Sequence, residues 1–249
     1  MKAVRTVVWK EWRSLQRFPG GRWRLWLTVA MPVAFFAFAS PVLAGPAWID
    51  GPFPVAVAVL VPAVVAMMVA PDVFAGERER RTLATLLAGP LPDGAILLGK
   101  AILPTALAWG VSLATSIVAI AVVNLVDPGQ GLLLPSTSTL VGSAVIGLLV
   151  AVLAVSAGVL VSLRADTVQQ AQQLLAVSLM VPGTVLGPGL VIATAADPDA
   201  VRRALTAWSP AAMFLAAALV LAVTDSAMAW AVRRRFRRDR LVVNLPAGR

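Results

Sequence analysis

The sequence contains neither cysteine nor histidine, and both absences restrict its chemistry. Without cysteine there is no disulfide and no thiolate metal site, and the composition indicates no redox compartment. Without histidine the chain lacks the commonest metal ligand and the usual general base near neutral pH. Both absences argue against a metalloenzyme or a histidine-dependent hydrolase.

Charged residues are also scarce. Only 13% of the 249 residues are charged, 59% are hydrophobic, and the mean hydropathy is +0.85. Soluble domains carry about twice this fraction of charge. The composition therefore predicts an all-α integral membrane protein, with residues 1–249 forming a single transmembrane domain.

Six apolar segments are predicted to cross the bilayer, and the fifth is broken. Their approximate bounds are 25–43, 54–74, 101–123, 140–163, a fifth that starts at 169, and 211–232. Pro182-Gly183 and Gly187-Pro188-Gly189 interrupt the fifth segment, and its apolar tail is too short to cross alone. Non-helical backbone at that depth is tolerated only inside protein or beside a water-filled cavity. We therefore expect a broken re-entrant segment before the last span.

Small residues recur four apart in the segment 140–163. The pairs are Ser143/Gly147, Ala154/Gly158 and Gly158/Ser162. This spacing lets helix backbones approach closely in lipid. We interpret it as a packing feature.

Residues 1–20 read as an interfacial elbow helix. At 100° per residue the apolar residues share one sector and the basic residues lie opposite. The apolar set is Met1, Val4, Val8, Trp12, Leu15 and Phe18; the basic set is Lys2, Arg5, Lys10, Arg13 and Arg17. Such a helix lies in the headgroup plane of a membrane. Glu11 lies at the edge of the apolar sector, where it needs a partner such as a basic group on another helix.

The positions of lysine and arginine predict the topology. Nineteen of the 21 lie on one side of the predicted spans, and the exceptions are Arg202 and Arg203. The positive-inside rule then places both termini, including the basic tail 233–249, in the cytoplasm. Since the positive charge is explained by topology, nucleic acid is not an expected partner.

The polar stretch 75–100 is predicted to be a cytoplasmic coupling loop. It opens with five consecutive charged residues, and Thr82 can then cap a short helix with an apolar stripe. The charged residues are Glu77, Arg78, Glu79, Arg80 and Arg81, and the stripe is Leu83, Leu86 and Leu87. The stripe either packs beneath its own bundle or enters a groove on a soluble partner.

Three further features bear on chemistry or transport. The segment Gly94–Lys100 resembles a phosphate-binding loop, but Ala101 lacks the hydroxyl that binds magnesium, so this chain is not expected to hydrolyse ATP by itself. Asp225 is the one acid inside a predicted span, and it either pairs with a group such as Arg233 or serves a transport pathway. Gln169 and Gln173 share a helix face that either is solvated or lines a cytoplasmic cavity.

The charged loop and the elbow together resemble a known family. GERERRTLATLLAGPLPDGAILLGK between the second and third spans, and WKEWRSLQRFPG at residues 9–20, are similar to the signature loop and elbow of type-2 ABC exporter permeases. The resemblance covers nearly the whole chain. Its main departure is Arg81, where many members have glycine.

The resemblance implies a permease subunit without enzymatic activity. Two six-span chains, as a homodimer or heterodimer, would form an export pathway in a bacterial cytoplasmic membrane for a drug, lipid, ion or similar cargo. Separate ATPase subunits would bind ATP and contact Glu77, Glu79 and Thr82–Leu87, while Lys10 and Glu11 would brace the elbow.

Two alternatives remain from the residues alone. An ion-coupled secondary transporter would work without an ATPase, although it would ordinarily need more buried ionisable groups. A polytopic membrane enzyme would need a polar catalytic set, which the absent histidine and cysteine and the sparse acids disfavour.

Overall fold

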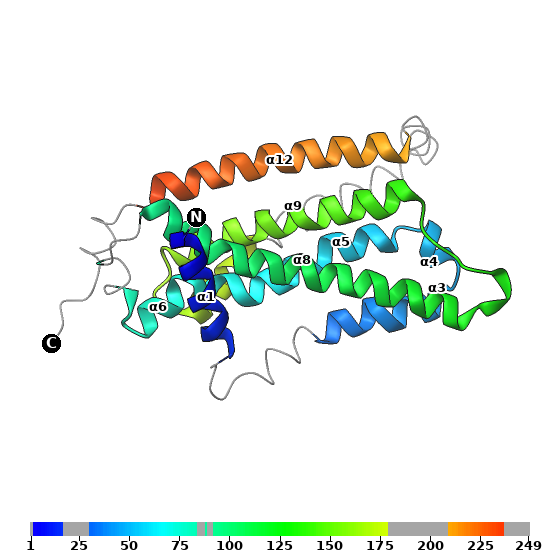
Figure 1. The fold of residues 1–249 in the computed structure, drawn as a ribbon, viewed down its shortest axis with the longest axis horizontal. Helices are drawn as coiled ribbons and strands as arrows, with labels where there is room; N and C mark the ends of the chain where they lie inside the picture. Colours follow the sequence, from blue (N-terminus) through cyan, green and yellow to red (C-terminus); the bar gives the residue numbers. More distant parts are fainter. Residues whose placement is uncertain (1, 17–29, 84–87, 89–91, 179–208, 237–249) are drawn as a thin grey trace.

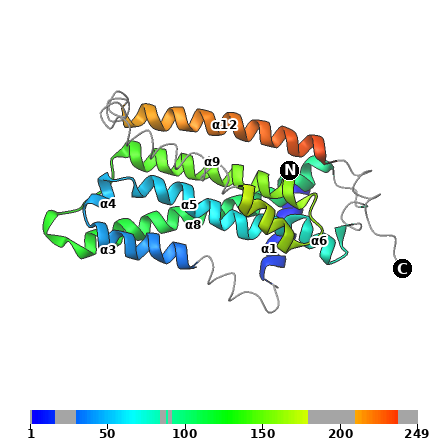
Figure 2. The same ribbon diagram turned by 180° about the vertical axis from the view of Figure 1, so that it is seen from behind.

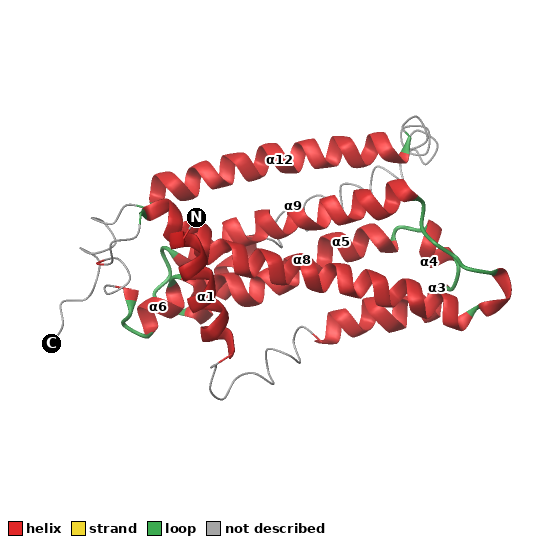
Figure 3. Ribbon diagram, viewed as in Figure 1, coloured by secondary structure: helices red, strands yellow, loops and turns green. Residues whose placement is uncertain are grey.

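All regular structure in the described part of the chain is helical (Figure 3). The structure is a computed structural model, and it describes residues 2–16, 30–83, 88, 92–178 and 209–236. The named elements are α1 (Lys2–Gln16), the π-helical η1 (Phe35–Ala39), α3 (Ser40–Ala44), α4 (Ala47–Asp50), α5 (Phe53–Val69), η2 (Ala70–Val73), α6 (Ala75–Glu79), α8 (Asp93–Val126), η3 (Pro128–Gln130), α9 (Thr137–Ser162) and α12 (Pro210–Arg235). Residues 168–178 form a further helix. The prediction of an all-α protein is confirmed.

Four helices are long and apolar enough to cross a membrane. They are Phe53–Glu79, Asp93–Val126, Thr137–Ser162 and Pro210–Arg235, and Ala30–Ala44 is a shorter apolar helix. The long helices lie lengthwise beside one another in both views (Figures 1 and 2). The chain is therefore a multi-pass membrane protein. The break predicted after residue 181 lies outside the described residues, so six spans remain a prediction.

α8 begins about two turns before the span that the sequence predicted from residue 101. Pro92 precedes it in an extended conformation, and Asp93 places a negative charge in the first turn, where the helix dipole favours it. The polar residues before Lys100 had suggested a loop. They are helical because this first part of α8 packs against α1.

Small residues bring α9 close to its neighbours, as predicted. A Cβ added to Gly147 would lie 3.4 Å from the carbonyl oxygen of Ala58 in α5, and one added to Gly158 would lie 2.5 Å from the Cβ of Ala70. α5 is the most enclosed span, since 44% of its most apolar window is buried, whereas the value for α12 is 6%. α12 is thus an outer helix that packs mainly on α9.

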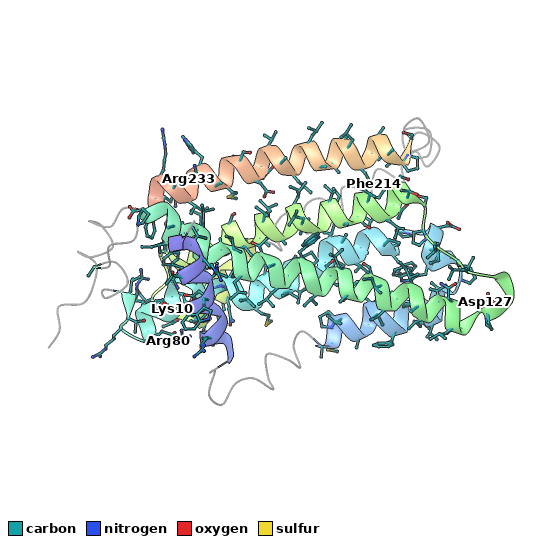
Figure 4. The ribbon with its side chains drawn as sticks, viewed as in Figure 1. Lys10, Arg80, Asp127, Phe214 and Arg233 are labelled. Atoms are coloured by element: carbon teal, nitrogen blue, oxygen red, sulfur yellow. The ribbon has the colours of Figure 1, made fainter. Side chains whose placement is uncertain are left out.

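Basic side chains gather at one end of the bundle. Figure 4 shows Lys10, Arg80 and Arg233 together at the end that holds α1 and α6, and Asp127 and Phe214 at the opposite end. We call the first the basic end. Its arrangement agrees with the topology that the charge distribution predicts.

The contact between α9 and α12 gives a test of this packing. A Cβ at Gly142 would lie 2.3 Å from Cγ of Phe214, whereas one at Gly110 of α8 meets nothing within 4 Å. We expect Gly142→Ala to destabilise the chain by about 1–3 kcal/mol through overpacking. Gly110→Ala should be neutral or stabilising, because alanine is the better helix former.

Thermal unfolding in detergent micelles, followed by the loss of the monodisperse peak, measures both changes. Equal midpoints for the two variants would contradict the close approach of α12 to α9.

Candidate functional site

Four charged side chains from three helices meet beside α6, and we call them the elbow junction. They are Lys10 and Glu11 of α1, Glu77 of α6 and Lys100 of α8. The Lys100 Nζ lies 2.9 Å from Oε1 of Glu11 and 3.0 Å from Oε1 of Glu77. The Lys10 Nζ lies 2.9 Å from the same Glu77 oxygen. The junction therefore joins the elbow, the start of the coupling loop and α8.

Burial makes this pairing obligatory. Lys100 is 2% exposed and Glu77 is 5% exposed. A buried charge without a partner is strongly unfavourable, so each of these groups depends on the others. Glu77 also accepts hydrogen bonds from the Lys10 ammonium and the Thr82 hydroxyl. The expectation that Glu11 needs a basic group on another helix is confirmed, and that group is Lys100.

Gly99 allows α1 to approach α8. A Cβ on Gly99 would lie 2.6 Å from the Cβ of Val7, which is 3% exposed. Val4 and Val8, from the predicted apolar face, are only half-buried. The face of the elbow that packs on protein is therefore centred on Val7 and differs from the sector predicted for lipid.

The next three charged residues of the loop each contact a different element. Arg78 donates to the carbonyl oxygens of Leu163, at 3.2 Å, and Ala165, just after α9 ends. Glu79 accepts a hydrogen bond of 2.7 Å from the backbone N–H of Val168, where helix 168–178 begins. Cations suit the carboxyl end of a helix and anions suit its amino end. Both side chains thus satisfy helix ends.

Arg80 closes the set by pairing with η2. Its Nη2 donates to both carboxylate oxygens of Asp72, at 2.8 and 3.0 Å. The four residues from Glu77 to Arg80 consequently tie α6 to α1, α8, η2, the end of α9 and the start of helix 168–178. The carboxylates of Glu77 and Glu79 both bind groups of their own chain, and the ATPase contact that the resemblance implies for these two residues stays a prediction.

Arg81 occupies a position that favours glycine. The backbone N–H of Arg81 donates to the carbonyl of Arg78, and that of Thr82 donates to the carbonyl of Glu77. This is a Schellman motif, whose second-last residue adopts the left-handed conformation. Arg81 has φ of 56°, the one positive value for a non-glycine residue in the described ranges. The left-handed conformation therefore explains why glycine would suit this position, as the family resemblance implies.

Of the three leucines in the predicted apolar stripe of the loop 75–100, only Leu83 lies within the described residues. Leu83 is 1% exposed and belongs to the hydrophobic core formed mainly by α5, α8 and α9. It packs beneath its own bundle, which was one of the two open alternatives. Leu86 and Leu87 lie outside the described residues.

The glutamines of helix 168–178 face outward. Gln169 and Gln173 are exposed, and neither lines the two cavities described below. Thr167 caps this helix: its hydroxyl accepts from the N–H of Gln170, and the Gln170 side chain accepts from the N–H of Asp166.

A large cavity lies between α8, α9 and α12. It has a volume of about 680 Å³ and is lined mainly by apolar side chains, with Asp93 and Arg233 at the basic end. A smaller one of about 100 Å³ includes Ser112, Ser116 and Ser143. Within the described ranges, no three metal-binding side chains cluster.

An aromatic contact connects the elbow junction to this cavity. The Lys100 ammonium lies 5.7 Å from the centre of the Phe74 ring, which precedes α6. The Phe74 ring lies 5.6 Å from that of Phe236, which ends α12 and lines the large cavity. Both rings are buried. The junction and the cavity are thus joined by side chains in direct contact.

The pairing that the sequence suggested for Asp225 is not found in the described part of the chain, and the alternative role of this residue in a transport pathway stays a prediction. Asp225 is 8% exposed and lies on α12, and neither carboxylate oxygen accepts a hydrogen bond from a described residue. The suggested pairing with Arg233 is not among the ion pairs of the described part of the chain.

The sequence assigned no contact to Lys100 of the junction, to Gly99 beside it, or to Asp72, which pairs with Arg80. It did single out Gly99-Lys100, as part of the rejected phosphate-binding motif. The usable signal was an acid, Glu11, at the edge of an apolar sector together with a Gly-Lys pair in another apolar helix, since close approach and a counter-charge are both needed for a buried ion pair.

Comparison with known families identifies the chain. Residues 47–230, about three quarters of the sequence, match the model of a family described as ABC-2 family transporter protein. Comparison with curated proteins gave no significant match.

The elbow junction predicts different costs for its two lysines. Lys100→Met leaves Glu11 and Glu77 facing each other without their shared cation and should destabilise the chain by about 3–5 kcal/mol. Lys10→Met is the matched control. Its side chain is 50% exposed, so the loss should be at most about 1 kcal/mol.

Chemical unfolding in micelles measures both values, and limited proteolysis reports release of the elbow. A similar stability loss in both variants would show that Lys100 is not the centre of the junction.

The conformation of Arg81 gives a second prediction. Arg81→Gly should stabilise the chain by roughly 1 kcal/mol, because glycine has no Cβ to oppose the left-handed conformation. Arg81→Ala keeps a Cβ and should give no such gain. Unfolding midpoints of both variants test this, and a gain with alanine equal to that with glycine would assign the effect to the lost side chain.

Proposed function

We propose that this chain, which belongs to the ABC-2 transporter family, exports its cargo with energy from a separate ATP-hydrolysing subunit. The chain is the permease of an ABC transporter and spans the membrane several times. The segment Gly94–Lys100, which resembles a phosphate-binding loop in sequence, is helical as part of α8. ATP binding is accordingly assigned to the partner.

The contacts of α6 carry this proposal. A force applied to a surface loop moves a transporter only if the loop is joined firmly to the spans. Glu77, Arg78, Glu79 and Arg80 join α6 to α1, α8, η2, the end of α9 and the start of helix 168–178 through ion pairs and hydrogen bonds. With these contacts α6 would act as a lever, because a movement imposed on it by a cytoplasmic partner would be transmitted to the membrane helices. We use the word lever for α6 in this sense.

The docking surface is assigned to the residues just after α6. Glu77 is buried in the elbow junction, so direct contact with the ATPase is assigned mainly to Thr82–Leu87, with the exposed Glu79 beside them. Leu83 anchors this stretch in the core. The remaining leucines of the stripe are then proposed to enter a groove on the ATPase.

Charge distribution and packing support the proposed assembly. The basic end, with both termini, is proposed to face the cytoplasm of a bacterium, and six spans per chain are proposed to cross its cytoplasmic membrane. Two such chains, identical or different, would form the pathway. Gln169 and Gln173 stay candidates for lining a water-filled cavity of that assembly, because both are exposed in the single chain.

Co-expression with its ATPase tests the docking surface. Leu86→Asp should reduce recovery of a subunit with a complete Walker A motif at least about tenfold, because a charge in an apolar groove is strongly unfavourable. Leu132→Asp is the matched control: this leucine is 77% exposed and follows η3, at the end opposite α6. Both variants should still insert into the membrane.

Two outcomes would overturn the proposal. One is full recovery of the ATPase with Leu86→Asp. The other is transport by the pure chain in liposomes, driven by an ion gradient without an ATPase, which would assign the chain to the secondary transporters.

A further inference from the structure

Asp225 is a buried acid in a membrane span that no described residue neutralises. It is 8% exposed, and both carboxylate oxygens lack a hydrogen-bond donor. An unpaired carboxylate in such a place is costly, and ionisable groups within membrane spans are retained where they meet a counter-charge or a transported species. A counter-charge for Asp225 must therefore come from outside the described part of the chain.

Lys100 shows that this chain does not leave every buried charge unpaired. Lys100 is also buried in a long helix, but it lies within 3.0 Å of two carboxylates. The chain thus satisfies one buried charge fully and leaves the other without a partner. The difference indicates a role for Asp225 other than holding the fold together.

Asp225 lies on the same face of α12 as residues that line the large cavity. Ala229, Val232 and Phe236 line the cavity from α12, and Asp225 precedes Ala229 by one turn on the same face. The cavity continues deeper along the other helices, to Trp109 of α8 and Leu148 of α9.

The register of α9 and α12 supports this placement. The two helices run side by side in the same direction (Figure 1), and Gly142 meets Phe214. An equal advance along both helices from this contact brings Asp225 to the turn of α9 that contains Val152 and Ser156. Both of those residues line the cavity. Asp225 thus lies at the depth of these lining residues, although it is not itself one of them.

We propose that this cavity binds a hydrophobic organic cation whose positive group pairs with Asp225. The inference rests on the proposed function, because it names the class of cargo. A volume of about 680 Å³ suits a drug-sized molecule, and the walls are largely apolar. Trp109 adds an aromatic face that attracts cations.

The charges at the mouth of the cavity agree with a cation inside. Arg233 is exposed, so its guanidinium can extend into water, whereas Asp225 is enclosed. A bound anion would bring a second negative charge beside Asp225. Contact with the cation requires a small movement of α12, which is the least enclosed of the long helices.

Binding of tetraphenylphosphonium to the purified chain in lipid nanodiscs tests the proposal. Asp225→Asn keeps the shape of the side chain and removes its charge, so affinity should fall about 10- to 100-fold. Asp225→Glu should retain most of the affinity. Asp127→Asn, at the opposite end of the bundle (Figure 4), is the control and should bind as the unchanged chain does.

The anion tetraphenylborate, of the same shape, separates charge from hydrophobicity. Its binding should not weaken in Asp225→Asn. Unchanged affinity of that variant for the cation, or an equal loss for both ions, would overturn the proposal. Since binding is measured without an ATPase, the result is independent of ATPase recovery, and either proposal can fail while the other stands.

Discussion

The ammonium group of Lys100 sets the arrangement of the basic end. It lies inside the protein, where a single charge would be strongly unfavourable, and it is compensated by one carboxylate from the elbow and one from α6. Since neither Glu11 nor Glu77 can leave without exposing an unpaired buried charge, α1, α6 and α8 have to move together. Gly99 makes this possible by letting the elbow backbone approach α8.

The alternating charges of the loop have a geometric basis. The turn between α9 and helix 168–178 presents carbonyl oxygens at the end of one helix and an N–H group at the start of the next. Arg78 binds the carbonyl oxygens and Glu79 binds the N–H group, so neighbouring residues of opposite charge match neighbouring helix ends of opposite polarity. A reversed order of charges would place like polarities together.

The sequence predicted the features that depend on local patterns. Hydropathy identified the four long helices, and the four-residue spacing identified Gly147 and Gly158 as packing sites. Long-range pairing was not predictable, because five adjacent charges offer many partners and only the fold selects among them. The cap at Thr167 and the early start of α8 depend on backbone geometry, which residue type specifies only to within a turn. Arg81 was noticed as a departure, but its left-handed conformation required the structure.

Lys100 and Asp225, two of the three buried charged residues in the described part of the chain, lie in differently packed regions: the first is firmly joined and the second is loosely packed. Lys100 pairs with two carboxylates and so joins α1, α6 and α8. Asp225 has no hydrogen-bond partner and lies on α12, which packs mainly on α9. Contact between Phe74 and Phe236 is the link between these parts, because Phe74 lies against Lys100 and Phe236 ends α12. A displacement of α6 would carry Phe74 with it and press on the end of α12. Because α12 is the span that the bundle restrains least, it is the one most easily shifted, and the unpaired acid moves with it.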